Sequence, residues 1–178
     1  MMVKSQTPSH EVQDDGSLPL VLILCTANSC RSQMAEGWLR AAAADFIEIA
    51  SAGSKPAGHV HPLAVQVMAE MGIDISRHRS KSFTDFLNKP VETVITVCAE
   101  SDEACPAFPG AHIKRYHWPF DDPAKSEGST VEKLKEFRRI RDQMRPVFEA
   151  YAAARKDGCI TTGWRGCGVS SFLTLPNK

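Results

Sequence analysis

The sequence predicts an α/β fold: a three-layer sandwich built around a four-stranded parallel sheet. Three observations support this prediction. Segments of strand and helix character alternate along the chain. The first strand, residues 18–24, is almost continuously apolar, which is typical of a parallel strand buried on both faces. A chain of 178 residues also has room for one domain with a sizeable core.

Each element of this fold has a local signal. The helix over 62–71 repeats apolar residues at helical spacing and is closed by Gly72. The helix over 130–156 carries a longer apolar stripe, and we expect Pro146 to kink it. The other predicted elements are a helix at 32–44 and strands at 46–52, 91–97 and 113–118. Right-handed crossovers between the strands would place a ligand site at their carboxyl ends.

The chain divides into one domain and two terminal segments. Residues 1–17 are predicted to be a disordered leader, and residues 18–156 form the domain. Residues 157–178 are rich in Gly and Ser without clear periodicity, which predicts a loosely structured tail.

The composition argues against several classes of function. Lys plus Arg and Asp plus Glu both number 21, so no excess charge favours nucleic acid or an anionic membrane as a partner. No apolar run approaches the roughly 20 residues of a membrane span, and no secretory signal is recognised, which predicts a cytoplasmic protein. Six cysteines in such a protein are expected to be reduced. Their spacing does not fit zinc, so we expect no metal and favour redox chemistry.

The loop Cys25-Thr-Ala-Asn-Ser-Cys-Arg31 joins the first strand to the first helix. Such a loop turns backbone amides inward, and the helix N-terminus adds positive partial charge, so a tetrahedral dianion is favoured there. Arg31 can bind two oxygens of the anion. The same field favours the thiolate form of Cys25, which is a nucleophile. The residues expected to bind the oxyanion or support the loop are Thr26, Ala27, Asn28, Ser29, Cys30 and Ser32, the last also bonding the thiolate.

A simpler interpretation of this loop must be weighed. A cysteine that ends an apolar strand is often only a small buried side chain, and a Cys-x5-Arg pattern occurs again at residues 159–165. The second copy has no strand before it and no helix after it, so we interpret it as a coincidence. Strand, loop and helix agree at residues 25–31, which favours the functional interpretation there.

Two further cysteines follow the third strand. Cys98 ends that strand and Cys105 comes seven residues later. In a helix these residues would lie ~10 Å apart along the axis, whereas a disulfide needs Cα atoms within about 7 Å. A bond between them therefore requires local unwinding. The alternative is a pair of buried helix cysteines.

An acidic pair follows the fourth strand, in His117-Trp-Pro-Phe-Asp-Asp-Pro123. A carboxylic acid there could protonate a departing oxygen. We choose Asp122, next to the rigid proline, over Asp121. From the sequence alone, a turn or a helix cap is the simpler explanation of these aspartates.

These motifs together resemble the thioredoxin-coupled arsenate reductases built on the low-molecular-weight tyrosine phosphatase fold. The resemblance covers residues 18–156 and rests on three motifs in the right order: Cys25 to Glu36, Cys98 with Cys105, and His117 to Ala124. It implies arsenate as substrate, thioredoxin as reductant and no tightly bound cofactor.

The resemblance also implies a relay of three cysteines. Cys25 would attack arsenate while Arg31 holds the oxyanion and Asp122 assists the departure of water. Cys98 would then attack the Cys25 adduct, releasing arsenite and leaving a Cys25–Cys98 disulfide. Cys105 would attack Cys98, and thioredoxin would reduce the resulting disulfide. Cys30 takes no part.

The chain departs from the family pattern at Ala27, at the Ala-Glu pair that follows Cys98, where a small-polar pair is more usual, and at Lys81. Ala27 stands where the family usually has Gly, and Ala would cost about 1 kcal/mol or more if that position requires positive φ. Some relatives hold a potassium ion beneath the loop, with an aspartate at the position we align to Lys81. Our hypothesis is that the Lys81 ammonium replaces that cation. Potassium is therefore not favoured as a cofactor of this chain.

Two other functions compete with arsenate reduction. A phosphatase acting on phosphotyrosine or a small phosphoester would need Cys25, Arg31 and Asp122 but has no use for Cys98 and Cys105. The sequence after Pro123 lacks the aromatic residues such phosphatases tend to carry, which favours a small inorganic anion. A third interpretation is an arsenic-sensing module, although thiols that meet only after unwinding make a poor preformed site.

Overall fold

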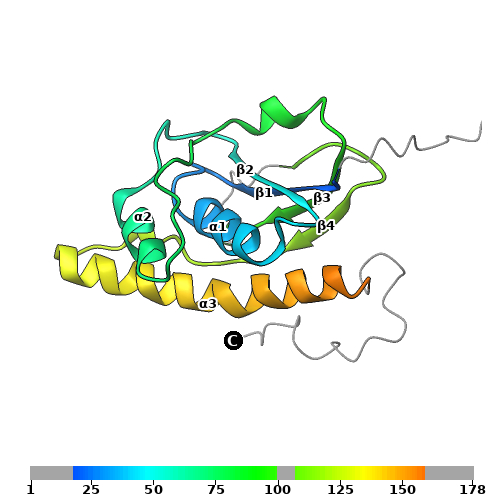
Figure 1. The fold of residues 1–178 in the computed structure, drawn as a ribbon. Coiled ribbons are helices and arrows are strands. Elements are labelled where there is room, and N and C mark those ends of the chain that lie inside the picture. The colour runs from blue at the N-terminus through cyan, green and yellow to red at the C-terminus, as the bar shows by residue number, and fades with distance from the viewer. Residues whose placement is uncertain (1–17, 100–106, 159–178) are drawn as a thin grey trace, which may run out of the picture.

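The computed structural model describes residues 18–99 and 107–158. Its centre is one parallel sheet in the order β2-β1-β3-β4, drawn in Figure 1. The strands are β1 (Leu20–Cys25), β2 (Glu48–Gly53), β3 (Val91–Thr96) and β4 (Lys114–His117). The helices are α1 (Arg31–Ala43), α2 (Pro62–Ala69) and α3 (Thr130–Lys156), with short 3-10 helices η1 (Phe83–Phe86) and η2 (Pro123–Lys125). The predicted four-stranded parallel sheet and α/β class are confirmed.

The predicted elements are all present, and only their ends differ. β1 begins at Leu20 because Pro19 cannot donate to a ladder, and α2 ends at Ala69, shortly before Gly72 turns the chain at a φ of +74°. α3 has the predicted bounds, and it continues through Pro146 as one helix. The predicted leader lies outside the described residues, as does the predicted tail from residue 159 onward.

The sheet separates two apolar clusters, which explains why β1 is buried along its whole length. Val21 and Ile23 face the larger cluster, formed with α1, α2 and α3. The alternate residues of β1, Leu20, Leu22 and Leu24, face a smaller cluster that includes Phe86 of η1 and Phe108. The molecule therefore has three layers, of which the one carrying η1 is thin. Figure 1 shows α3 running along the helical face, beside α1 and α2.

The strand order places the ends of β1 and β3 at the point where the chain reverses its direction across the sheet. From β1 the chain moves to β2 on one side, and it then crosses back to β3 on the other side. Loops that leave the two central strands therefore diverge at the carboxyl ends of those strands, where ligands bind in folds of this type. Cys25 ends β1, and Cys98 follows β3, whose pairing with β1 extends to a bond from Val97 N to Leu24 O at 2.9 Å.

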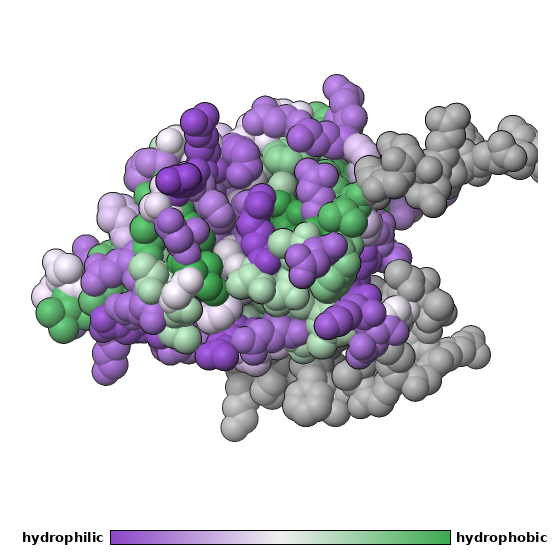
Figure 2. All heavy atoms as spheres, in the orientation of Figure 1, coloured by the Kyte–Doolittle hydropathy of each residue, from purple (hydrophilic) through white to green (hydrophobic). Residues whose placement is uncertain are grey.

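Figure 2 shows hydrophilic side chains over much of the viewed face, with hydrophobic groups interspersed among them. Among residues 18–99 and 107–158, no helix combines the length and apolar character needed to cross a membrane.

Candidate active site

The loop from Cys25 to Arg31 is held so that its backbone amides turn inward. The carbonyls of Cys25, Thr26, Ala27 and Ser29 accept hydrogen bonds from the backbone amides of Ser54, Lys55, Ala57 and His61, at 2.9 to 3.3 Å. In a planar trans peptide the N–H points away from the carbonyl, so the amides of the following residues face the opposite side. The Asn28 amide accordingly donates to Cys25 Sγ at 3.1 Å. The loop can therefore surround an anion with amide donors.

The end of β2 and the residues that follow it approach this loop closely, and the approach requires a glycine at position 53. A Cβ atom at Gly53 would lie 2.5 Å from the carbonyl oxygen of Thr26, well inside van der Waals contact. The same segment supplies the amides that bind the loop carbonyls. A side chain at position 53 would therefore push away the strand end that shapes the loop.

Asn28 is the central residue of the loop. Its φ is +47°, a conformation that asparagine tolerates better than most residues. Its side-chain amide donates to Ser32 Oγ at 2.9 Å and to Ser51 Oγ at 2.8 Å, while Oδ1 accepts from Lys81 N at 2.7 Å. The left-handed residue is thus Asn28 and not Ala27, so the cost considered for Ala27 does not arise.

The sulfur of Cys25 has two polar neighbours. Besides the Asn28 amide, which donates to it, the hydroxyl of Ser32 lies 2.9 Å from Cys25 Sγ. When Cys25 is a thiolate, only the hydroxyl can be the donor of this second bond. α1 begins at Arg31, and no described side chain caps its N-terminus, so its first amides also face this region. Together these donors can bind an anion beside the sulfur.

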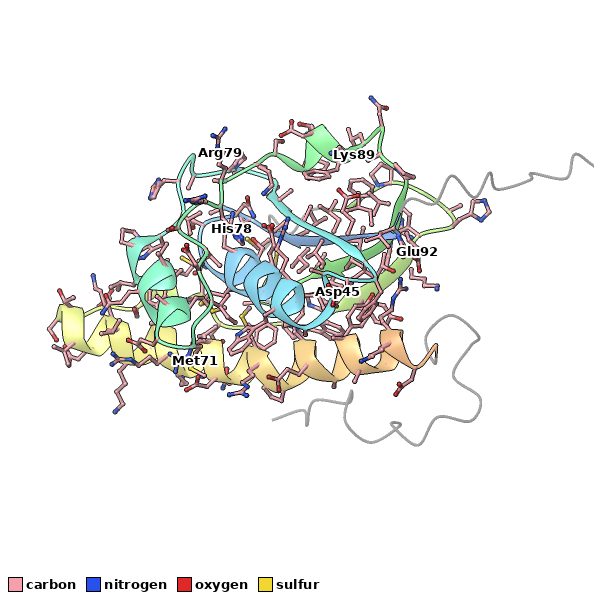
Figure 3. The ribbon with its side chains drawn as sticks, viewed as in Figure 1. Asp45, Met71, His78, Arg79, Lys89 and Glu92 are labelled. Atoms are coloured by element: carbon pink, nitrogen blue, oxygen red, sulfur yellow. The ribbon has the colours of Figure 1, made fainter. Side chains whose placement is uncertain are left out.

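Gln33 connects the loop to the segment after α2. Its Nε2 donates to Asn28 O and Oδ1 at 3.1 and 3.0 Å and to Arg79 O at 3.0 Å. Its Oε1 accepts from His78 Nδ1 at 3.1 Å, and Figure 3 shows His78 close to α1. Burial lowers the pKa of His78, while the nearby Glu36 carboxylate opposes that shift. Gln33 is fully buried and all its polar atoms are used.

A buried carboxylate lies behind Asn28. Ser51 Oγ, which accepts from Asn28, donates to Glu36 Oε2 at 2.6 Å. Glu36 is paired with Arg40 at 2.9 Å, and the Lys81 ammonium lies 3.7 Å from Glu36 Oε2. The ammonium that we expected to replace a cation therefore forms an ion pair with the carboxylate at the end of a chain of hydrogen bonds from Asn28.

The guanidinium of Arg31 is buried, and it binds the segment after β4. Nη2 donates to Asp122 Oδ2 at 2.9 Å, and Nη1 donates to the Phe120 carbonyl at 3.2 Å. Asp122 also caps η2, since its Oδ1 accepts from Ala124 N at 3.2 Å. Asp121 points elsewhere, to Arg139, and its side chain is 73% exposed. Only Asp122 of the two is brought to the loop.

Cys30 and Cys98 are both buried, and both belong to the same apolar cluster as Cys25. Burial raises the pKa of Cys30 to about 12, and the hydroxyl of Ser29, 3.6 Å from its sulfur, opposes that shift. Cys98 is fully buried in the same apolar cluster as Cys25 and Cys30. Cys105 and Cys159, like Cys167, lie outside the described residues.

Sequence analysis missed part of this arrangement. Gln33 and Glu36 were noticed only as members of the motif, and Ser51 only as part of a strand. A polar residue within a strand predicted to be buried was the available signal for Ser51. Within residues 18–99 and 107–158, no cluster of three His, Cys, Asp or Glu side chains could hold a metal ion.

The chain is similar to known proteins in sequence and in structure. Residues 20–157 match the family described as "Low molecular weight phosphotyrosine protein phosphatase". The arsenate reductase of Halalkalibacterium halodurans is 43% identical over 137 residues, which are 77% of this chain and 97% of that protein.

Two solved structures have the same fold. A structure described as an arsenate reductase in the phosphate binding state gives a TM-score of 0.64 at 32% identity, covering 76% of this chain and 98% of that one. The thioredoxin-dependent arsenate reductase of Corynebacterium glutamicum gives a TM-score of 0.53 at 28% identity, covering 77% of this chain and 65% of that one.

Proposed function

Because this chain belongs to the low molecular weight phosphotyrosine protein phosphatase family, in which a relative of 43% identity is an arsenate reductase, we propose that it reduces arsenate to arsenite. The electrons come from Cys25 and Cys98, and Cys105 passes the resulting disulfide to thioredoxin. The placement of Cys25 and Cys98 in one buried cluster, at neighbouring strand ends, supports this proposal over simple phosphoester hydrolysis.

The first step is anion binding and nucleophilic attack. Arsenate enters the ring of inward amides, and Arg31 exchanges part of its bonding with Asp122 and Phe120 for the anion's oxygens. The Cys25 thiolate forms a bond to arsenic, and one oxygen of arsenate departs as water. Asp122 supplies the proton for that water. The donors around Cys25 Sγ then stabilise the charge on the adduct.

The second step transfers the electrons. The Cys98 thiolate attacks Cys25 Sγ, a sulfur–sulfur bond forms, and the pair of the sulfur–arsenic bond remains on arsenic, which leaves as arsenite. Cys105 then attacks Cys98, expelling Cys25 as thiolate, and the dithiol of thioredoxin reduces the Cys98–Cys105 disulfide. The thioredoxin dependence of the C. glutamicum relative supports this choice of reductant. Cys30 stays a neutral thiol throughout, since its pKa is raised to about 12.

We also propose that the Lys81 ammonium supplies the positive charge that a bound cation would provide beneath the loop. Its charge is 3.7 Å from Glu36, whose carboxylate orients Ser51 and thereby Asn28. The side chain is 31% exposed, so its contribution is modest. Activity should then be independent of added potassium, and strong potassium activation would contradict this role.

The decisive experiment measures arsenate reduction with thioredoxin, thioredoxin reductase and NADPH. Cys105→Ser should lose steady-state turnover but still release about one arsenite per chain, because Cys25 and Cys98 suffice for one round. Cys30→Ser is the matched control and should turn over normally. Full turnover by Cys105→Ser would reject the relay.

A phosphatase is the second candidate, supported by the family to which the chain belongs. It would use Cys25 as nucleophile, Arg31 for the anion and Asp122 as acid. Hydrolysis of p-nitrophenyl phosphate that is fast, and unaffected by replacing Cys98 with Ser, would favour it over the reductase.

A further inference from the structure

His61 connects three parts of the molecule: the loop, α2 and α3. It is the residue before α2, and its backbone amide donates to the Ser29 carbonyl at 2.9 Å. Its ring Nδ1 accepts from the Leu63 amide at 3.1 Å. The ring also packs on Phe137 of α3, with ring centroids 4.7 Å apart. Only its backbone amide was used above, and its ring has been given no role.

The bond from the His61 amide fixes one of the loop's anion donors. The Ser29 carbonyl and the Cys30 N–H belong to the same planar peptide. When the carbonyl is held by His61, the Cys30 N–H is turned to the opposite side, toward the interior of the loop. The direction of this donor therefore depends on where the His61 amide points.

The ring of His61 in turn fixes its own backbone. An amide N–H can only donate, so the bond from Leu63 requires an unprotonated Nδ1. This contact gives α2 its N-cap and holds residue 61 in an extended conformation, at φ −64° and ψ 129°. Stacking on buried Phe137 limits the remaining freedom of the ring.

We propose that His61 is a positioning residue of the anion site: its neutral ring caps α2 and so holds the backbone amide that orients the Ser29–Cys30 peptide toward the oxyanion. The residue does not touch the substrate. The inference deepens the proposed arsenate reduction and rests on it only for turnover, because anion binding by the loop can be measured separately.

Protonation of the ring would remove the cap, since an imidazolium has no acceptor. Burial lowers the pKa of His61 below its ordinary value of 6.5, and His59 and Lys133 act in the same direction, while Asp122 opposes them. The neutral form is therefore kept at neutral pH and is lost as the pH falls through the lowered value. Anion affinity should weaken in the same acidic range.

The test compares three replacements of His61 by their affinity for inorganic phosphate, measured as protection of Cys25 from iodoacetamide. His61→Asn keeps a capping oxygen and should bind phosphate within about twofold of the parent. His61→Phe keeps the packing on Phe137 but not the cap, and it should bind about tenfold more weakly, as should His61→Ala. The exposed His59→Ala is the control and should bind normally.

The pH dependence separates this role from a merely structural one. Phosphate affinity and arsenate kcat/KM of the parent, relative to His61→Asn, should stay constant near neutral pH and fall only as the pH drops below 6.5 through the lowered pKa of His61, because Asn cannot be protonated. A ratio that also stays constant at acidic pH, or normal phosphate binding by a folded His61→Phe, would overturn the proposal. Loss of arsenate turnover in the parent, with phosphate binding as expected, would reject the proposed function but not the role of His61.

Discussion

Cys25 and Cys30 lie at opposite ends of one loop, and the structure surrounds them differently. Cys25 Sγ accepts from the Asn28 amide and lies 2.9 Å from the Ser32 hydroxyl. Cys30 Sγ lies 3.6 Å from Ser29 Oγ, and its burial raises its pKa to about 12. Reactivity within the loop thus depends on whether the sulfur faces the inward amides, and a count of cysteines does not reveal it.

The largest effect is expected when each of the two cysteines is replaced in turn. Cys25→Ser should lower arsenate turnover by roughly a thousandfold or more, because a serine hydroxyl is a far weaker nucleophile than a thiolate. Cys30→Ser should stay within about threefold of the parent. The thioredoxin-coupled assay measures both, and similar losses in the two variants would break the comparison.

Alkylation sharpens the same comparison without mutation. A thiol with a pKa of about 12 is almost wholly protonated from pH 7 to pH 9, so Cys30 should react with iodoacetamide at least about a hundredfold more slowly than Cys25. Cys30 becomes reactive only as the pH rises toward its raised value. Peptide mass spectrometry gives both rates, and rapid labelling of Cys30 at pH 8 in the folded chain would refute this prediction.

The two aspartates after β4 offer a second pair. Asp122 binds Arg31, whereas Asp121 is exposed and binds Arg139. Asp122→Asn should lower kcat by about a hundredfold, since it removes both the acid and the charge that orients Arg31. Asp121→Asn should change kcat by less than twofold. Steady-state kinetics of the two variants measures this difference. Equal losses of kcat in both would show that Asp122 has no special role in the reaction.

Asn28 tests how far the loop depends on its internal bonds. Asn28→Ala leaves several buried donors and acceptors without partners, so unfolding free energy should fall by about 2–4 kcal/mol and KM should rise about tenfold. Asn88→Ala, at an exposed position, is the control. Urea unfolding and kinetics report the two effects, and a normal KM would show that the loop forms without Asn28.

The smallest expected effect concerns the cation. Lys81→Met should lower kcat/KM only about threefold, because the ammonium is partly exposed and Arg40 still neutralises Glu36. Added potassium should restore part of this loss in the variant while leaving the parent unchanged. Assays in sodium and potassium salts compare the two, and potassium activation of the parent would contradict the role of Lys81.

The sequence alone predicted the sheet, the three α-helices and the loop that joins β1 to α1. Those predictions succeeded because local chemistry decides them: a continuous apolar run needs two covered faces, and an apolar stripe closed by Gly72 marks where a helix ends. The motif that begins at Cys25 could likewise be recognised from consecutive residues of the sequence. The order of the strands in the sheet could not be predicted, since many strand pairings satisfy the same apolar pattern.

Only the tertiary structure decided which distant groups meet at the loop. Asp122, and not Asp121, binds Arg31, although Asp122 and Arg31 are 91 residues apart in the chain. Ser51 and Lys81 likewise contact Asn28 from distant parts of the sequence. The physical reason is that parallel strands bring their carboxyl ends to one edge whatever their separation in sequence. The sequence therefore determined which residue types are present at the site. The packing of the sheet determined which charges and hydrogen-bond partners each of these residues meets.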